Sequence, residues 1–277
     1  LKLSGAVSPF EMLEKKEWTF DNFKNWLPTI ATLTADKNIY ALSAPYDIFT
    51  TAAIYANGGN KYIKDESGIY SFGYTQPEAI DAINWSASIF NMKDYVDAQG
   101  KAQFEESETV ITCAGSYTAT ENYRPEQILN VIEDITWLYF PYGPKGEYGK
   151  SYGSYLPYET FTGITLTGDE QDTAFVFDKI TEPLTEFGED GYLFGHTKRN
   201  LFHHVEEGFD VWYDNYINCN YDILSVIYSE INSGSVNNKI NTALSNAARG
   251  SKSAAEAIEA IAESVQTDIN KAVNDIN

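Results

Sequence analysis

The sequence predicts an α/β protein in which sheets are flanked by helices, and three observations indicate this class. Short apolar runs typical of strands occur at residues 39–42 and 110–113. Amphipathic helical patterns separate and follow them, most clearly at residues 75–90 and 254–276. The length of 277 residues is sufficient for two lobes, each with its own core.

The first third of the chain predicts alternating helices and strands. Thr19 is expected to cap a helix that bends or restarts at Pro28, because proline removes a backbone donor. A strand at residues 39–42, a helix at 47–56 and a hairpin or extended loop at 62–74 should follow.

Farther along, the clearest start of a helix is Thr75-Gln76-Pro77-Glu78, which has the T-x-x-E pattern of a capping box. Residues 110–113 and 135–140 are expected to be strands, and 141–158, rich in glycine and proline, a loop. The last third should be mostly helical, since residues 254–276 carry apolar side chains at steps of three and four.

The composition argues against some partners and favours others. Forty acidic and nineteen basic residues give a net charge of −21, which repels phosphate backbones, so we expect no nucleic acid partner. No stretch approaches the roughly 20 apolar residues that span a bilayer, so we expect membrane association only through an anchor outside this sequence. The 20 tyrosines favour ligands that are partly polar and partly apolar. Cys113 and Cys219 could form a disulfide or remain buried thiols.

No pattern supports catalysis, a cofactor or a metal site. Residues 149–153, GKSYG, match G-x-S-x-G, but no apolar strand precedes the serine and no helix pattern follows it. His203 and Glu207 could share a helix face, yet the H-E-x-x-H pattern is missing. The acidic residues of 105–108 are neighbours in sequence and do not provide two carboxylates across one glycosidic bond. We therefore expect a protein that is not an enzyme.

Aromatic residues recur where predicted elements end. Tyr46 follows a strand and turn, Tyr117 follows the next long strand, and Trp212, Tyr213 and Tyr221 are expected to precede a helix. The crevice at the carboxyl ends of strands is the usual ligand site of α/β folds, so this recurrence predicts a binding cleft.

These stretches, in this order, resemble the extracellular solute-binding proteins of family 1, the carbohydrate receptors of bacterial ABC importers. Residues 8–21, SPFEMLEKKEWTFD, are similar to the family's "P-x-x-L, basic, W-T-x-D-x-F" passage. Residues 104–112, FEESETVIT, resemble its "F-x-x-G-x-x-A-M" segment, and 115–117, GSY, its "G-x-W". Residues 141–146, PYGPKG, are like its "P-x-G-P-x-G" loop. The similarity extends over nearly the whole chain, and the order and spacing of the motifs carry it.

The resemblance implies a two-lobed periplasmic-binding-protein-like fold of type II, without the N-terminal portion of the first lobe. Residues 1–145 would be the first part of the carboxyl-terminal lobe. Residues 146–190 would be a returning segment of the amino-terminal lobe, and 191–277 the helical completion of the carboxyl-terminal lobe.

The resemblance also implies a receptor that captures a sugar or oligosaccharide between its lobes and delivers it to the permease of an ABC importer. Such a receptor is extracellular, either a cell-surface lipoprotein or a periplasmic protein. It implies the following ligand-binding residues: Tyr46, Asp47, Ser116, Tyr117, Glu121, Trp212, Tyr213 and Tyr221. The solute stays open among sugars, sugar acids, polyols and oligopeptides. A carbohydrate-active enzyme and a surface adhesion or scaffold fragment are the alternatives.

Overall fold

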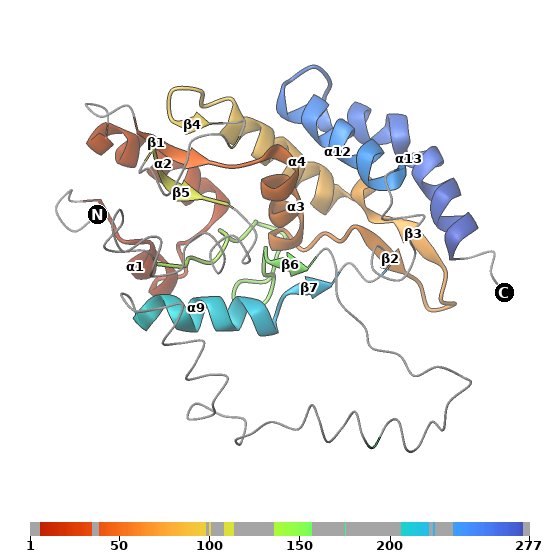
Figure 1. Cartoon of the computed structure of the whole chain (residues 1–277), viewed down its shortest axis with the longest axis horizontal. Helices are drawn as coiled ribbons and strands as arrows, with labels where there is room; N and C mark the ends of the chain where they lie inside the picture. Colours follow the sequence, from red (N-terminus) through yellow and green to blue (C-terminus); the bar gives the residue numbers. More distant parts are fainter. Residues whose placement is uncertain are drawn as a thin grey trace.

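The computed structural model describes residues 6–34, 39–97, 100, 108–113, 136–156, 175, 206–221, 224 and 235–273, and contains a small parallel sheet, at the upper left in Figure 1. Its central strand β1 (Tyr40–Ser43) pairs in parallel with β4 (Val96–Asp97) on one side and β5 (Thr109–Thr112) on the other. Leu42 lies opposite Val96 and Ile111. The prediction of a mixed α/β fold with helices flanking the sheet is confirmed for this part of the chain.

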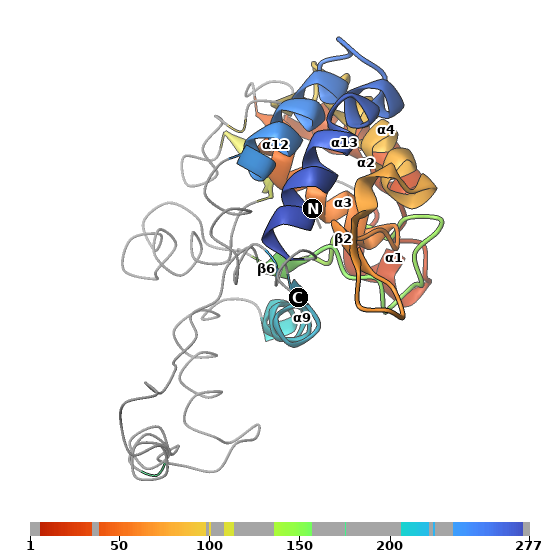
Figure 2. The ribbon, with the colours of Figure 1, turned by 90° about the vertical axis from the view of Figure 1, so that its right-hand side faces the viewer.

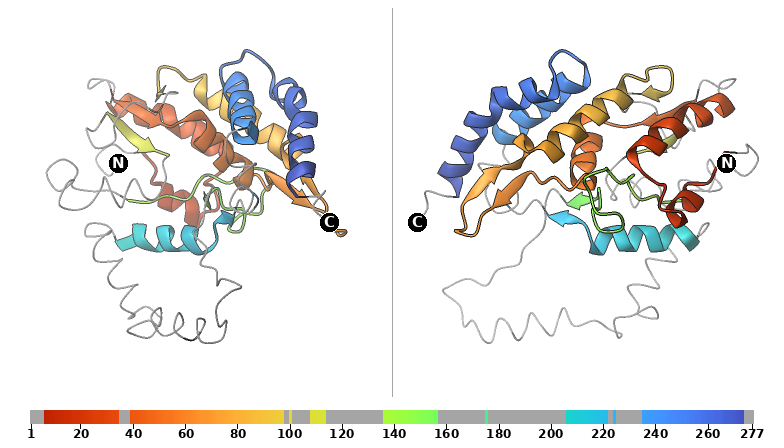
Figure 3. Two further views of the ribbon diagram at one scale, coloured as in Figure 1. Left: turned by 45° about the vertical axis from the view of Figure 1, so that its right-hand side comes forward. Right: turned by 180° about the vertical axis from the view of Figure 1, so that it is seen from behind.

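Helices cover the sheet and one another (Figures 2 and 3). α2 packs on β1; α3 and α4 pack together, and α12 packs on both of them and on α13. The helices are α1 (Pro9–Glu14), α2 (Phe20–Thr34), α3 (Tyr46–Ala56), α4 (Pro77–Phe90), α9 (Glu206–Ile217), α12 (Ser235–Ala248) and α13 (Ala254–Ala272). The remaining elements are a hairpin of β2 (Tyr62–Lys64) and β3 (Tyr70–Phe72), the 3-10 turn η2 (Gly73–Thr75), and the parallel pair β6 (Tyr155–Leu156) and β7 (Asn220–Tyr221).

The final amphipathic helix forms as the sequence predicts. Ser253 Oγ accepts a hydrogen bond from the Glu256 N–H at 3.3 Å, and Glu256 Oε2 accepts one from the Ser253 N–H at 3.0 Å, which completes a capping box. Val265 and Ile269 are fully buried on its inner face. Gln266 on the same helix bonds the backbone of β3, so α13 also holds the hairpin.

The predicted capping box at Thr75 is wrong. Thr75 lies in η2, where its hydroxyl donates to the Phe72 carbonyl at 3.1 Å, and Gln76 is the N-cap residue of α4 without a side-chain cap. Pro77 stands at the first helical position, where its fixed φ and missing N–H suit the start of a helix.

A single helix α2 runs through Pro28, so the alternative of a restart there is wrong; burial of Leu27 and Ile30 offsets the lost backbone hydrogen bond. The expected strand at 135–140 also differs from the structure. Residues 136–140 form no strand; the carbonyl of Tyr139 instead accepts a hydrogen bond from the Trp18 indole at 2.8 Å.

Trp85 and Phe140 join the two hydrophobic clusters of the core. One cluster lies among α3, α4, α12 and α13, and the other among α1, α2 and β1. Phe20 stacks on Trp85 with ring centroids 3.7 Å apart, and Phe140 makes an edge contact with Phe49 at 5.0 Å. The aromatic contacts therefore connect the segment around residue 140 to both halves of the core.

Asn57, fully buried at the C-terminal end of α3, holds the 141–146 loop against the helices. Its Nδ2 donates to the Glu78 carbonyl at 2.7 Å, and its Oδ1 accepts from the Lys145 N–H at 3.0 Å. The loop approaches so closely that a Cβ at Gly143 would overlap the Asn57 side chain. One amide side chain thus connects α3, α4 and the loop.

Replacing Asn57 should destabilise the protein. Asn57→Ala removes both hydrogen bonds of a buried amide and leaves the part-buried Glu78 carbonyl and Lys145 N–H without these partners, which should lower the free energy of unfolding by about 1–3 kcal/mol. Urea unfolding followed by circular dichroism measures the change. The matched control is Asn238→Ala, at an exposed position of α12, which should change it by less than about 0.5 kcal/mol. Equal effects of the two substitutions would contradict the role of Asn57.

Candidate functional site

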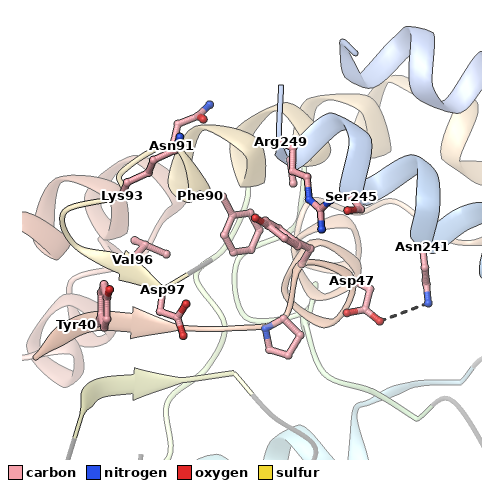
Figure 4. A pocket seen from close by; sticks show the side chains of 13 residues that line it. Tyr40, Asp47, Phe90, Asn91, Lys93, Val96, Asp97, Asn241, Ser245 and Arg249 are labelled. Carbon is pink, nitrogen blue, oxygen red and sulfur yellow. Dashed lines mark hydrogen bonds between the residues drawn. The ribbon is translucent and has the colours of Figure 1, made fainter. Parts of the chain in front are cut away.

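A pocket of about 980 Å³ opens between the first turn of α3, the end of α4 and the C-terminal half of α12 (Figure 4). β1 ends at Ser43, and Pro45, in an extended conformation, precedes the first turn of α3. Tyr46 and Asp47 in that turn line the pocket. They therefore lie beyond the carboxyl end of the central strand, where ligands of α/β proteins usually bind.

Two carboxylates give the pocket its acidic groups. Asp47, in the first turn of α3, accepts a hydrogen bond from Asn241 Nδ2 of α12 at 3.4 Å (Figure 4). Asp97, at the end of β4, accepts one from the Ser43 hydroxyl at 3.1 Å. These oxygens and the Asn241 amide can exchange hydrogen bonds with the hydroxyls of a solute.

The half-buried ring of Tyr46 forms an aromatic wall of the pocket. It makes an edge contact with Phe90, with ring centroids 4.7 Å apart. The guanidinium carbon of Arg249 lies 5.7 Å from the ring centroid. The wall therefore combines an apolar surface with a cation.

The negative charge of Asp47 also influences the pKa of two groups that do not line the pocket, Cys113 and Tyr155. Burial raises the pKa of the Cys113 thiol to about 12, and the negative charge of Asp47 adds to this effect. Burial is also the main reason why the pKa of Tyr155 is raised, with smaller contributions from Cys113, Tyr74 and Asp47. No disulfide joins Cys113 and Cys219 in the structure.

A second polar cluster, centred on Asp214 of α9, fixes that helix to residues 136–156. The hydroxyls of Tyr139 and Tyr152 each donate to Asp214 Oδ2 at 2.8 Å, and Asn218 Nδ2 donates to Oδ1 at 2.9 Å. Burial, followed by the hydrogen bond to Asp214, raises the pKa of Tyr152 to about 12. The pKa of Tyr139 is raised for the same reasons. The sequence analysis missed this cluster, although the WYDNY stretch places a carboxylate among aromatic residues.

The structure brings together only part of the predicted binding set. Tyr46 and Asp47 line one pocket. Ser116, Tyr117 and Glu121 lie outside the described residues, so their predicted roles stay predictions.

The other three predicted residues lie elsewhere. Trp212 is half-buried and Tyr213 is 41% exposed, and both lie within α9 rather than before a helix. Neither lines the pocket, and α9 lies on the side of the molecule opposite α12 (Figure 1). The backbone of Tyr221 pairs with Leu156 in the β6 and β7 ribbon. The prediction that Trp212 and Tyr213 precede a helix is wrong because α9 begins earlier, at Glu206, whereas Tyr221 does lie before a helical residue, Leu224.

The sequence analysis also missed a polar face of α12 that lines the pocket. Asn241, Ser245 and Arg249 follow one another at steps of four, opposite the buried Ile240 and Leu244. That spacing places three polar side chains on one helix face and is visible in the sequence. The sequence does not show which other elements this polar face of α12 lies next to.

No three histidine, cysteine, aspartate or glutamate side chains of the described residues converge as metal ligands. No helix in this part of the chain combines the length and apolar character that crossing a bilayer requires. His203 lies outside the described residues, as does the side chain of Glu207.

Comparison with known proteins relates the fold to one class. No family model matches the sequence, and no curated protein matches it either. Among solved structures, UgpB from Mycobacterium tuberculosis in complex with glycerophosphocholine is similar, with a TM-score of 0.57 and 14% sequence identity. The chain shares the fold of UgpB. The match covers 91% of this chain, which spans 63% of the UgpB chain.

The tyrosines around Asp214 should make stability sensitive to alkaline pH. Tyr152 has its pKa raised from 10.0 to about 12 by folding, so the unfolded chain releases this proton first. The free energy of unfolding should therefore fall as the pH rises from about 10 to 12. Urea midpoints measured across this range test the effect.

Tyr152→Phe should make this fall shallower, because one of the proton-releasing groups is gone. Tyr40→Phe, at a 38% exposed position, is the control and should keep the wild-type slope. A slope unchanged in Tyr152→Phe would contradict the assignment.

Proposed function

We propose that the protein is a solute-binding receptor that captures a sugar or oligosaccharide and delivers it to an ABC importer. The observation that carries the proposal is the pocket at the carboxyl end of β1, where Tyr46 and Asp47 stand together in a solute-binding-protein fold. A pyranose has an apolar face that packs on an aromatic ring, and hydroxyls that need fixed polar partners. Tyr46 supplies the aromatic ring, and Asp47 and Asn241, which are hydrogen-bonded to each other, supply the polar partners.

The receptor would act by closing two lobes around the solute. On this proposal residues 1–145 and 191–277 belong to the carboxyl-terminal lobe and 146–190 to the amino-terminal lobe. Ser116, Tyr117 and Glu121 would then complete the sugar-facing wall. A cell-surface lipoprotein or a periplasmic protein, working with an importer permease, is the setting that fits this activity.

The similarity to UgpB supports the proposal at the level of fold. UgpB was solved with glycerophosphocholine bound, so this fold holds small polar solutes in at least one protein. A sequence identity of 14% is too low to assign glycerophosphocholine to this chain as its ligand. The residues of the pocket therefore have to support the choice of solute.

A carbohydrate-active enzyme is the second candidate, and one observation favours testing it. Asp47 and Asp97 both line the pocket, and glycoside hydrolysis uses two carboxylates that flank one bond. A turnover assay on a glycan panel separates the two functions. Product formation that Asp47→Asn or Asp97→Asn abolishes would replace the receptor proposal.

Ligand binding should be detectable as thermal stabilisation. In a screen of mono- and oligosaccharides, a ligand present at 100 times its Kd should stabilise the native state by about 2.7 kcal/mol. Calorimetric titration then measures Kd for the hits. If no saccharide raises Tm or gives a titration signal, the sugar-receptor proposal fails.

Tyr46→Ala should weaken such a hit by about 0.5–1.5 kcal/mol, because it removes the aromatic face. Tyr46→Phe keeps the ring and is the matched control, which should retain most of the affinity. Equal loss in both variants would assign the effect to the hydroxyl, and no loss in either would remove Tyr46 from the site.

A further inference from the structure

The guanidinium of Arg249 has no acceptor of its own in the described part of the chain. Its side chain forms no hydrogen bond or ion pair there and contacts the ring of Tyr46 at 5.7 Å. A guanidinium has five N–H donors in a rigid fork. Arg249 therefore presents unused donors in the pocket that it lines.

The backbone at Arg249 is well defined by the end of α12. The Arg249 N–H donates to the Ser245 carbonyl at 3.0 Å, and the next residue, Gly250, has a φ of +69°. The Ser251 N–H returns to the Asn246 carbonyl at 3.0 Å. This glycine-capped end fixes where the arginine leaves the helix.

The helix dipole accounts for a positive charge at the C-terminal end of α12, but not for the direction in which the Arg249 side chain extends. The Arg249 side chain extends over the ring of Tyr46, which in turn makes an edge contact with Phe90. Stacking on an aromatic face occupies the flat side of a guanidinium and leaves its polar edges free. N–H groups at those edges can form bidentate hydrogen bonds with a carboxylate or a phosphate.

The local charge pattern supports the same conclusion. The chain carries a net charge of −21, yet two of its cations, Lys93 and Arg249, line this pocket. Both are exposed, and neither forms an ion pair with Asp47 or Asp97 of the same pocket. The cations are therefore accessible to a solute.

We propose that Arg249 determines specificity in this pocket and selects solutes that carry a carboxylate or phosphate group on a hydroxylated body. The anionic group binds the guanidinium over Tyr46, and the hydroxyls reach Asp47 and Asn241. This inference rests on the proposed receptor function and narrows its solute class from sugars in general to anionic ones.

Matched pairs of solutes test the inference by calorimetric titration of the full chain. One arm compares glucose with glucuronate and maltose with maltobionate, for a carboxylate. The other compares glucose with glucose 6-phosphate and glycerol with glycerol 3-phosphate, for a phosphate. The anionic member of at least one pair should bind about tenfold or more tightly than its neutral partner.

Arg249→Gln should remove most of that advantage, weakening the anionic member about tenfold or more and the neutral member by less than about twofold. Arg249→Lys keeps the charge without the fork and should restore part of the affinity. Lys252→Gln removes an exposed charge three residues away, outside the pocket, and should leave both members unchanged.

The outcomes separate this inference from the proposed function. If neutral members bind as well as anionic ones, or Arg249→Gln weakens both equally, the inference is overturned and the receptor function stands. If no member of any pair binds, this inference is also overturned, and the receptor then depends on the wider saccharide screen. The pairs in which Arg249→Gln weakens binding of the anionic solute show whether the pocket binds a carboxylate or a phosphate.

Discussion

The hydrogen bonds of Asn57 determine how the rest of the described structure is assembled. Its amide connects the end of α3 to the start of α4 and to the backbone of the 141–146 loop. Buried amides are costly to leave without partners, so this arrangement permits few alternatives. Phe140 then reaches the aromatic contacts around Trp85, and the following segment reaches Asp214 on α9. The buried Asn57 side chain thus begins a series of contacts that runs from α3 through residues 140–152 to α9.

α3 has different roles at its two ends. Its C-terminal end holds the loop through Asn57, while its N-terminal end presents Tyr46 and Asp47 in the pocket. The interior of the helix between them is largely buried, with Phe49, Ala53 and Ile54 almost without exposed surface. A closely packed helix of this kind holds the pocket residues at a defined distance from the loop.

The pocket combines features that are usually separated in an acidic protein. Carboxylates, amides, an aromatic ring and a guanidinium all line it. Asp47 can accept from hydroxyls, and Arg249 can donate to oxyanions, so the pocket is asymmetric in charge. A solute with hydroxyls at one end and a negative group at the other matches this asymmetry.

The sequence by itself determined the elements whose information is local. The hairpin at 62–74, the strands around Leu42 and Ile111, and the capped helix after Ser253 all follow from periodicity, turn residues and side-chain caps. The position of Tyr46 and Asp47 after a strand was also readable, because the strand and its turn are adjacent in sequence.

Only the tertiary structure decided which distant residues meet. Arg249 lies about two hundred positions from Tyr46, and Asp214 lies 62 positions from Tyr152, so no local pattern relates them. Packing also overrode local signals, since α2 continues through Pro28 and residues 136–140 form no strand. Periodicity indicates which face of an element is polar, whereas the partner of that face depends on how helices and sheet pack around a shared core.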